Sequence, residues 1–348
     1  MSLAANEAGL DLGETEELVL VHDRATGLGA VVAIDDTTLG PAIGGVRWRD
    51  YQDEPAAIAE VRRLARVMTL KSAVAEIPSG GAKSVVFRPS PATHGMARRV
   101  IMEAFGRLVA RLDGRYVPGL DMGTTLEDLE AMSAHAPGIC IVEPSEHTAV
   151  GIFAGITAAV GMHFDDGLAG RRVLVQGVGH VGASLALKLA QAGAAVTVAD
   201  VDPDRAAAVA RAAGGDLLDP TEVVGHPCDI FVPCAGGRLV DAQSAEAFKC
   251  SIIAGAANDV LSHRDAAPLL MARGIDYVPD FLINSGGVIS IHARRAGWND
   301  ARTDTAVRSI GERVRSVLER SRETGRTPLE LAEEMASIRL GHVVRVPD

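Results

Sequence analysis

The sequence predicts a two-domain α/β protein, and three observations support this fold class. The chain has 348 residues, which is long enough for two domains with separate cores. Strand-like and helix-like segments follow one another along both halves of the chain. From about residue 146 they become regular strand–helix repeats, which are typical of a parallel, doubly wound sheet.

The first half is predicted to begin with strands and continue as a mixture of helices and strands. ELVLVHD and LGAVVAID alternate like strands and are separated by turn residues. A helix is expected over EPAAIAEVRRLARVMTLKSAVAE, because Ile58, Val61 and Leu64 recur at helical spacing. GGAKSVVF and RYVPGLD then predict strands, and ATHGMARRVIMEAFGRLVARL and LEDLEAMSA predict helices.

The second half is predicted to hold the parallel sheet. A helix, HTAVGIFAGITAAVGMHF, leads into the strand of RRVLVQG, and the strands of CDIFVPC, CSIIAGAA and GIDYVPD follow. The chain closes with two expected helices, DTAVRSIGERVRSVLERSRETG and TPLELAEEMASIRL.

Composition excludes several classes of function. The net charge of −11, without a basic stripe, argues against nucleic-acid binding. The acidic start MSLAANEAGLDLGETEE does not look like a signal peptide, and the run TAVGIFAGITAAVGM is too short for a membrane span. We therefore expect a cytoplasmic protein with no membrane partner. Three soft ligands, His226, Cys228 and Cys234, lack a clear fourth, so no metal is expected and the cysteines are interpreted as buried thiols.

The second half carries a dinucleotide-binding pattern. Gly177, Gly179 and Gly182 form G-x-G-x-x-G between an apolar strand and a helix, and Asp200 ends the next strand. The first glycine permits a tight turn, the second lets the backbone approach a pyrophosphate, and the third allows close helix–strand packing. The carboxylate of Asp200 would bind the adenosine ribose and repel a 2′-phosphate, so the pattern favours NAD over NADP.

Lysine is rare in this chain, and two lysines lie in the nearly apolar run MTLKSAVAEIPSGGAKSVV. Of 34 basic residues only four are lysines, which, unlike arginines, can lose their proton when desolvated. Beside a nicotinamide cofactor, one of Lys71 and Lys83 could hold a substrate carboxylate and the other, with a lowered pKa, could act as a general base. Gly80 and Gly81 are interpreted as backbone that approaches a ligand. The alternative is two structural lysines that extend to solvent from a helix end and a turn.

The chain resembles the leucine/phenylalanine/valine branch of the amino-acid dehydrogenases. The resemblance rests on LGPAIGGVRW, MTLKSAVAEIPSGGAKSVV, VPGLDMGTT, HTAVGIFAGI, GVGHVG, PCAGG, IIAGAAND and VPDFLINSGGVIS, and extends from about residue 17 to residue 340. It implies a catalytic and oligomerisation domain over residues 1–145, a Rossmann-type NAD-binding domain over 146–325, and an active-site cleft between them. A C-terminal helix and tail over 326–348 would pack back toward the first domain.

The resemblance also implies roles for individual residues. Lys83 matches the catalytic lysine, and Asp121 matches the acid that exchanges a proton with the substrate amine. Lys71 matches the lysine that binds the substrate carboxylate, helped by Gly44 and Gly45. The remaining matches are substrate contacts at Asn258, side-chain pocket positions Ile43, Met68, Gly119, Val288 and Ile291, and cofactor contacts at Thr148, Gly177, Gly179, His180, Val181, Gly182, Asp200, Cys234, Ala235 and Asn258. His180 is expected to be a solvated loop residue and not a catalyst.

The implied reaction is the reversible oxidative deamination of an apolar L-amino acid with NAD. Hydride leaves the substrate Cα to give an iminium, neutral Lys83 activates a water, and Asp121 carries the proton needed for ammonia to depart. The 2-oxo acid is the other product, and phenylalanine- or leucine-like side chains are expected. The resemblance implies a homo-oligomer, either a dimer or an octamer.

Several positions depart from the family pattern and leave the substrate open. They are Val46 and Trp48 in GGVRWRDY, Leu120 before Asp121, Asp259 after Asn258, and the lack of an aromatic residue in VMTLK. A glutamate dehydrogenase-like activity would need a spare cation, which the pocket segments lack. A hydroxy-acid dehydrogenase would usually pair a histidine with a carboxylate. A non-catalytic NAD-binding oligomer would have no need of a lysine with a lowered pKa.

Overall fold

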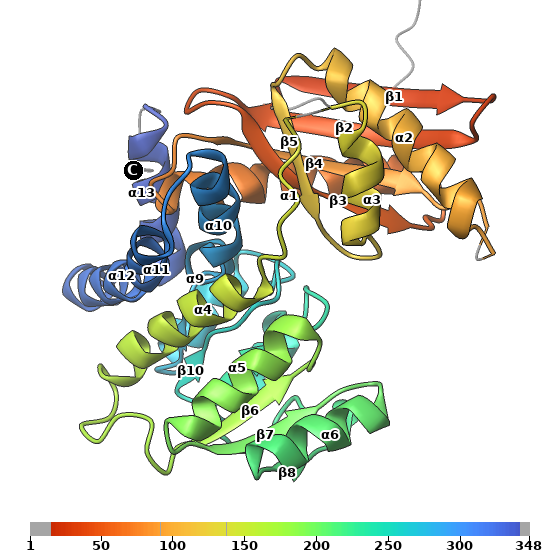
Figure 1. Ribbon diagram of the computed structural model, residues 1–348. Coiled ribbons are helices and arrows are strands. Elements are labelled where there is room, and N and C mark those ends of the chain that lie inside the picture. Colours follow the sequence, from red (N-terminus) through yellow and green to blue (C-terminus); the bar gives the residue numbers. More distant parts are fainter. Residues whose placement is uncertain (1–14, 91, 137, 342–348) are drawn as a thin grey trace, which may run out of the picture. The chain divides into compact units, whose positions relative to one another are not determined.

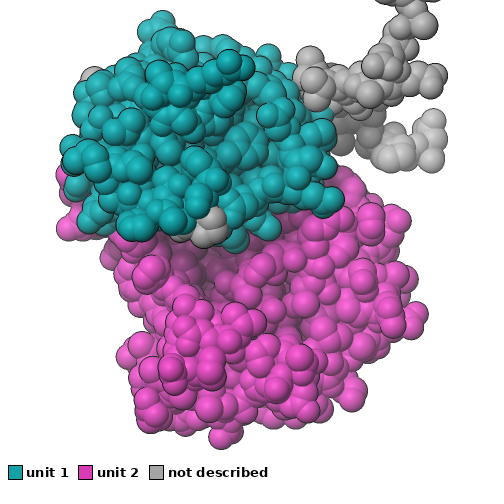
Figure 2. All heavy atoms as spheres, turned by 90° about the vertical axis from the view of Figure 1, so that its right-hand side faces the viewer, with its two compact units in different colours: residues 1–69, 79–139 teal, residues 70–78, 140–348 magenta. Residues whose placement is uncertain are grey.

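The computed structural model describes residues 15–90, 92–136 and 138–341, and it divides into two compact units. Unit 1 comprises residues 1–69 and 79–139, and unit 2 comprises residues 70–78 and 140–348. Figure 2 shows unit 1 in teal and unit 2 in magenta. The predicted two-domain α/β class is confirmed, and the part of the expected C-terminal tail over 342–348 lies outside the described residues.

Within the described residues, unit 1 contains a five-stranded mixed sheet in the order β1-β2-β4-β3-β5 (Figure 1). β1 and β4 are antiparallel to β2, whereas β3 is parallel to both β4 and β5. The elements of this unit are β1 (Glu17–Asp23), β2 (Leu28–Asp36), β3 (Ala42–Arg49), α1 (Glu54–Val74), β4 (Gly80–Phe87), α2 (Gly95–Arg111), β5 (Tyr116–Leu120) and α3 (Leu126–Ser133), with the end of α1 from Leu70 grouped with unit 2.

The sheet of unit 1 lies between two helical layers. Val32 and Ile34 of β2 pack with buried residues of α2 and α3, whereas the alternate residues Val31 and Ala33 pack against α1. Because both faces are covered, β2 and β4 are almost entirely buried, which accounts for the apolar stretches VVAI of β2 and VVF of β4.

Unit 2 contains a parallel sheet, which over the described residues has six strands in the order β11-β10-β9-β6-β7-β8. Its strands are β6 (Arg172–Gln176), β7 (Ala195–Ala199), β8 (Asp216–Leu217), β9 (Ile230–Pro233), β10 (Ile252–Ile253) and β11 (Asp276–Tyr277). Its helices are α4 (Ser145–Val160), α5 (His180–Gln191), α6 (Pro203–Ala213), the 3₁₀ turn η1 (Pro220–Glu222), α7 (Ala242–Ala247), α8 (Ala266–Ala272), α9 (Asp280–Ile283), α10 (Gly286–Arg295), α11 (Asp300–Arg308), α12 (Ile310–Thr324) and α13 (Pro328–Arg339). The strand–helix repeats thus form the parallel sheet that the sequence predicts.

The expected single helix over DTAVRSIGERVRSVLERSRETG is wrong, because the structure forms α11 and α12 with a break at Ser309. Both helices contact α4, and the buried Ile310 lies against Gly151 of that helix. The break is one residue long, and Ser309 keeps right-handed helical angles (φ −64°, ψ −8°), so the apolar pattern continues across it and does not reveal it. α13 packs on α12 and β11.

Among the residues that the structure describes, no helix combines the length and apolar character needed to cross a bilayer.

Gly81 allows α1 to approach β4 closely. A Cβ atom at this position would lie 2.0 Å from the backbone nitrogen of Thr69. The space beside Gly80 is likewise filled by the carbonyl oxygen of Asp36, 1.8 Å from an ideal Cβ position. Both glycines therefore serve close packing of the protein backbone, and the approach of a ligand that their sequence context suggested stays a prediction.

Gly81→Ala should lower the free energy of unfolding by about 1–3 kcal/mol, because α1 must move away from the sheet. Gly161→Ala is the matched control, since a Cβ atom there would be 3.6 Å from Thr157 O, an ordinary contact. Urea unfolding of the two variants measures the difference. Equal midpoints for Gly81→Ala and wild type would contradict this account of the packing.

Candidate active site

Lys83 is a buried lysine on the face of the unit 1 sheet that α1 covers. It pairs in register with Ala33 of β2, and Ala33 and Val85 belong to the apolar cluster beneath α1. Only 6% of its side chain is exposed. A charged amine in such surroundings needs a partner, because burial of an isolated charge is costly.

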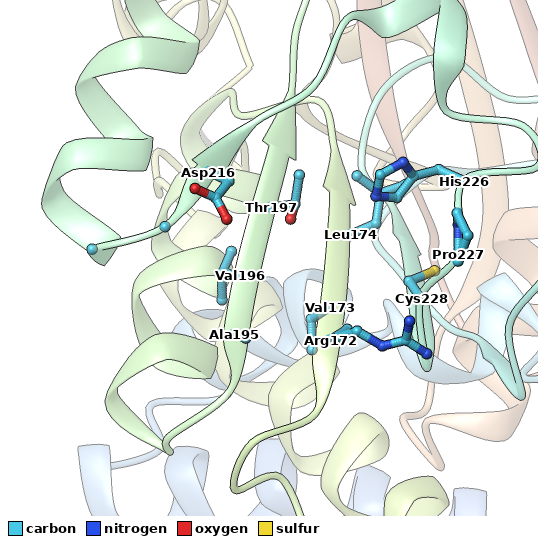
Figure 3. A pocket seen from close by; sticks show the side chains of 12 residues that line it. Arg172, Val173, Leu174, Ala195, Val196, Thr197, Asp216, His226, Pro227 and Cys228 are labelled. Atoms are coloured by element: carbon cyan, nitrogen blue, oxygen red, sulfur yellow. The ribbon is translucent and has the colours of Figure 1, made fainter.

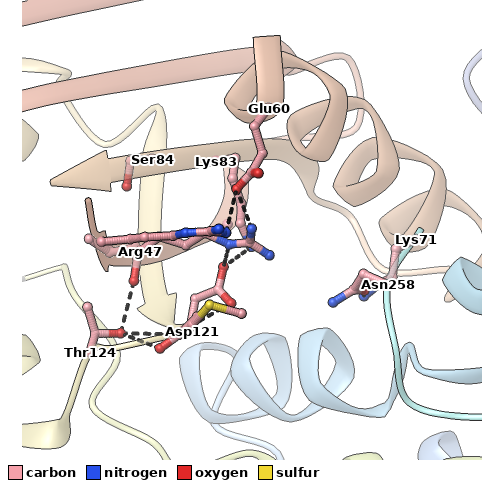
Figure 4. Close-up of polar contacts among 12 residues, drawn as sticks. Arg47, Glu60, Lys71, Lys83, Ser84, Asp121, Thr124 and Asn258 are labelled. Carbon is pink, nitrogen blue, oxygen red and sulfur yellow. Dashed lines mark hydrogen bonds and ion pairs between the residues drawn. The ribbon is translucent and has the colours of Figure 1, made fainter. Parts of the chain in front are cut away.

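Asp121 provides that partner from the loop that directly follows β5. Its Oδ2 atom forms an ion pair with Lys83 Nζ (Figure 4). Its Oδ1 atom accepts a hydrogen bond of 2.7 Å from the Met122 backbone N–H. Thr124 Oγ1 accepts the Asp121 backbone N–H at 2.9 Å and donates to Val46 O at 2.9 Å, so the loop is tied to β3.

Gly45 makes room for the carboxylate. An ideal Cβ atom at Gly45 would lie 2.7 Å from Asp121 Cβ and 3.0 Å from Leu120 O. At Gly44 a Cβ atom would lie 1.8 Å from Ala82 O, so the two glycines let β3 lie close to β4 and β5. Their predicted contact with a substrate carboxylate stays a prediction.

Arg47 joins the ion pair from β3. Its Nε atom donates to Asp121 Oδ2 at 3.0 Å, and its Nη1 atom forms an ion pair with Glu60 of α1. Glu60 Oε1 also accepts a hydrogen bond of 2.6 Å from the Tyr51 hydroxyl. Lys83, Asp121, Arg47 and Glu60 thus form a chain of alternating charges across four elements of unit 1 (Figure 4).

This arrangement shifts the acid–base properties of both members of the central pair. Burial lowers the pKa of Lys83; Asp121 acts to raise it, and Arg47 lowers it further. Burial acts to raise the pKa of Asp121, but the charges of Lys83 and Arg47 outweigh it and hold that pKa well below its ordinary value. The carboxylate is therefore ionised, and the lysine loses its proton more easily than an ordinary lysine.

Lys71 lies in the last turn of α1 and groups with unit 2. Its Nζ atom donates to Asn258 Oδ1 at 2.8 Å. Asn258 Oδ1 also accepts from Asn284 Nδ2 at 3.1 Å, and Asn284 Oδ1 is a buried atom with no hydrogen-bond partner among the described residues. The structure thus brings together two predicted substrate residues, Lys71 and Asn258, and adds Asn284.

The glycine-rich turn lies at the carboxyl end of β6. Gly177 has φ of +88°, and a Cβ atom there would lie 2.7 Å from Ala235 N. At Gly182 a Cβ atom would lie 2.0 Å from Gly177 O, whereas the space beside Gly179 is open for 4 Å. The turn has the tight bend, the close packing and the approachable backbone that a pyrophosphate site requires, and α5 begins at His180.

Asp200 is fixed beside this turn. Its Oδ2 atom accepts the Val178 N–H at 2.7 Å, and its Oδ1 atom accepts from Arg205 Nη2 at 2.8 Å. Burial acts to raise the pKa of Asp200, but the hydrogen bonds from Arg205 and from backbone N–H groups lower it, so the side chain is a carboxylate. These residues fit the phosphates and ribose of a dinucleotide.

The other predicted cofactor residues of unit 2 lie partly beside the same turn. Cys234 and Ala235 follow β9, and Cys234 N donates to Gln176 O at 2.7 Å. Burial raises the pKa of the Cys234 thiol to about 12, so it is a neutral packing group. Thr148 lies in the first turn of α4, where its hydroxyl donates to Pro144 O at 2.9 Å.

Comparisons with known proteins identify the family of this chain. The dimerisation domain of the Glu/Leu/Phe/Val dehydrogenases matches residues 17–137, and the Glutamate/Leucine/Phenylalanine/Valine dehydrogenase domain matches residues 204–341. Leucine dehydrogenase of Thermoactinomyces intermedius is 35% identical over 93% of this chain and 90% of its own length. The chain belongs to the Glu/Leu/Phe/Val dehydrogenase family.

Two further similarities are to proteins of Nostoc punctiforme. L-tryptophan dehydrogenase of Nostoc punctiforme is 35% identical over 95% of this chain and 94% of its own length. A crystal structure of L-tryptophan dehydrogenase from Nostoc punctiforme superposes with a TM-score of 0.78 at 34% identity and covers 94% of this chain and 96% of that one. The resemblance that the sequence motifs indicate is confirmed.

The residues predicted to line the side-chain pocket can be located within each unit separately. Ile43 and Met68 are buried in unit 1, where Gly119 pairs in register with Gly45. Val288 and Ile291 are buried residues of α10 in unit 2. Their shared role in binding a side chain stays a prediction.

Sequence reasoning missed Arg47, Glu60 and Asn284. Arg47 lies in GGVRWRDY, a run that the sequence comparison treated only as a departure from the family pattern. Thirteen residues separate Arg47 from Glu60 and seventy-four separate it from Asp121, so no local spacing reveals the contacts. The sequence feature that could have indicated Arg47 as a site residue is an arginine directly after the apolar run AIGGV, two residues after Gly45.

A separate cavity of about 220 Å³ lies elsewhere in unit 2 (Figure 3). It is lined by the first residues of β6 and β7 and by His226, Pro227 and Cys228. It is therefore at the amino ends of the strands, whereas the glycine-rich turn and Asp200 follow the carboxyl ends. Across the described ranges, no group of three or more His, Cys, Asp or Glu residues is placed to hold a metal ion.

Proposed function

We propose that this family member catalyses the reversible oxidative deamination of an apolar L-amino acid to its 2-oxo acid and ammonia, with NAD as cofactor. The observation that carries the proposal is the buried Lys83–Asp121 pair, in which the pKa of the lysine is lowered and the carboxylate is ionised. A buried lysine with a lowered pKa is suited to act as a general base. The relatives named as leucine and tryptophan dehydrogenases support an apolar amino acid.

Asp121 acts first as a proton acceptor in this proposal. An amino acid arrives as an ammonium ion and must lose a proton before its Cα hydrogen can leave as hydride. The sequence assigned Asp121 to carry a proton, but Lys83 and Arg47 keep it ionised, so it must take that proton from the substrate. Asp121 later returns the proton to the departing amine.

Lys83 acts as the general base. Protonation of Asp121 removes the negative charge that raises the pKa of Lys83, while Arg47 continues to lower it. Neutral Lys83 then takes a proton from the water that attacks the iminium carbon. Lys83 then releases this proton to solvent and takes the hydroxyl proton of the resulting carbinolamine. Asp121 protonates the amine, so that ammonia leaves and the 2-oxo acid forms.

Lys71 binds the substrate carboxylate in this proposal, and Asn258 makes a further polar contact to the bound amino acid. Lys71 Nζ and Asn258 Oδ1 are 2.8 Å apart, so the amide oxygen orients the ammonium group. The lysine can form a charge-assisted hydrogen bond to a carboxylate, which is stronger than one between neutral groups.

Residues of the second unit hold the cofactor. Gly177, Gly179 and Gly182 would bind the pyrophosphate at the start of α5, and Asp200 would bind the adenosine ribose. When bound, the nicotinamide ring supplies the hydride acceptor. Asp200 favours NAD, although Arg205 lies next to it.

We also assign the chain's larger organisation. Residues 1–145 form the catalytic and oligomerisation domain, 146–325 the NAD-binding domain, and 326–348 a C-terminal helix and tail. The match to a dimerisation domain supports a homo-oligomer, either a dimer or an octamer. Size-exclusion chromatography with light scattering measures which one forms.

The first prediction concerns the two lysines. Lys83→Ala should lower kcat about 100-fold or more, because the base is lost. Lys71→Ala should mainly raise KM for the amino acid, about tenfold to 100-fold, as a charged hydrogen bond of about 1.5–3 kcal/mol is lost.

Wild-type kcat/KM should rise with pH through an apparent pKa below the ordinary lysine value of about 10.4, since only the neutral amine accepts a proton. A Lys83→Ala enzyme with more than about a tenth of wild-type kcat would exclude Lys83 as the base.

The second prediction concerns the cofactor. Wild-type kcat/KM should be higher with NAD⁺ than with NADP⁺. Asp200→Ala should reduce that preference about tenfold or more, because the carboxylate is gone and Arg205 remains to bind a 2′-phosphate. Asp200→Ala combined with Arg205→Ala is the control and should gain no NADP⁺ activity. Equal or better wild-type activity with NADP⁺ would refute this role of Asp200.

The third prediction concerns the substrate and tests the proposed function itself. A spectrophotometric screen of the twenty L-amino acids with NAD⁺ at alkaline pH should show large apolar ones ahead of valine and alanine, and glutamate inactive. Gly119→Ala should reduce activity on the bulkiest substrate more than on valine, because the added methyl fills the pocket, an effect of about 1–3 kcal/mol. Glutamate as the best substrate would favour the glutamate dehydrogenase-like alternative. No activity with any amino acid would favour a non-catalytic NAD-binding oligomer.

A further inference from the structure

Arg47 occupies an unusual position behind the Lys83–Asp121 pair. Its guanidinium contacts Asp121 with Nε and Glu60 with Nη1, so two different edges of the group are used. Only 11% of its side chain is exposed. A lysine could not make both contacts in the same way, because guanidinium donors have a fixed, planar arrangement.

The contacts of Arg47 share an atom with the ion pair. Asp121 Oδ2 accepts from Arg47 Nε and also binds Lys83 Nζ. Glu60 is in turn fixed by Tyr51, whose hydroxyl is 2.6 Å from the same carboxylate oxygen that Arg47 binds. The orientation of Asp121 toward Lys83 therefore depends on a side chain that α1 and Tyr51 hold in place.

We propose that Arg47, held by Glu60, is a positioning residue for the proposed reaction: it fixes Asp121 Oδ2 against Lys83 and supplies the permanent positive charge that balances the pair. Arg47 itself transfers no proton, because a guanidinium stays protonated at any working pH. The inference rests on the proposed function for its effect on turnover. Its effect on Lys83 can be measured without turnover.

The charges around Lys83 determine whether the loss of a neighbour raises or lowers the pKa of Lys83. Asp121 and Glu60 favour the ammonium form of Lys83, whereas burial and Arg47 disfavour it. Arg49 faces Glu60 at 3.9 Å. Further charged groups of this region include Asp35 of β2 and Arg66 of α1, which lie 3.6 Å apart, and Asp35 also accepts a hydrogen bond from Thr69. Asp36, which is buried at the end of β2, pairs in register with Gly81 of β4. On β5, Tyr116 is bound to Ser84 and to Gly44 O.

Removal of Arg47 and neutralisation of Glu60 should therefore shift the pKa of Lys83 in opposite directions. Arg47→Met removes a positive neighbour, so the pKa of Lys83 should rise. Glu60→Gln removes a negative neighbour, so the pKa of Lys83 should fall. If the two substitutions acted only by destabilising the protein, the pKa of Lys83 would not shift in opposite directions.

The experiment measures the pH dependence of Lys83 acetylation by trace acetic anhydride, peptide by peptide, with mass spectrometry. The chain has only four lysines, and the exposed Lys249 serves as the internal reference. The midpoint for Lys83 should move to higher pH in Arg47→Met and to lower pH in Glu60→Gln. Arg47→Lys should bring the midpoint back toward wild type, because it restores the charge.

Measurements of kcat distinguish the effect of the charge of Arg47 from the effect of its geometry. At a pH above the midpoint, kcat of Arg47→Met and of Arg47→Lys should both be reduced about tenfold to 100-fold, because neither side chain can hold Asp121 and Glu60 together. Tyr51→Phe should reduce kcat less, since it loosens Glu60 without changing a charge. Arg66→Met is the matched control: it removes another arginine that contacts an aspartate in this unit, and its Lys83 midpoint should equal that of wild type.

The outcomes distinguish this inference from the proposed function. Unchanged midpoints in both Arg47→Met and Glu60→Gln, or shifts in the same direction, would overturn it, as would full kcat in Arg47→Lys. If Arg47→Met does not fold by circular dichroism, Glu60→Gln alone decides through its downward shift. A wild-type enzyme that oxidises no amino acid would refute the proposed function, while the acetylation midpoints would still decide the role of Arg47.

Discussion

The ion pair between Lys83 and Asp121 is the interaction on which the structure around it depends. Both groups are largely buried, and the attraction between two buried charges offsets their desolvation only when further hydrogen bonds satisfy them. The Met122 N–H and Arg47 provide those bonds to Asp121. The glycine at position 45 leaves the space that the carboxylate fills. A lysine at position 83 is thus tolerated because the Met122 N–H, Arg47 and Gly45 are arranged for its partner.

The same physical requirement, close approach of backbone segments, recurs in both units. In unit 1, Gly81 lets α1 lie against β4, and this brings the helix that carries Glu60 onto the face that carries Lys83. In unit 2, Gly182 lets α5 lie against the turn after β6, and Gly179 leaves the backbone open. Glycine therefore has two uses that sequence alone does not separate: packing against protein, as at Gly81, and exposure of backbone to a ligand, as at Gly179.

Much of the fold could be predicted because its elements are set by local patterns. The apolar alternation of ELVLVHD and the strand–turn–helix around Gly177 are local, and the structure has them at those positions. The break between α11 and α12 could not be predicted, because the contact of Ile310 with Gly151 is non-local. The site follows the same rule. Lys83 was found from its unusual surroundings in the sequence, whereas the contacts of Arg47 arise only when β3, α1 and the loop after β5 come together.

The choice between lysine and arginine acquires a physical meaning at this site. A cation that must stay charged is best supplied by arginine, and a cation that must release its proton can only be lysine. Arg47 and Lys83 bind the same oxygen of Asp121, so one carboxylate faces one permanent and one titratable positive charge. Rarity alone does not establish this role, because Lys188 forms a surface ion pair with Glu146 that arginine could also form. It is burial beside a permanent charge, and not the scarcity of lysine, that distinguishes Lys83 from Lys188.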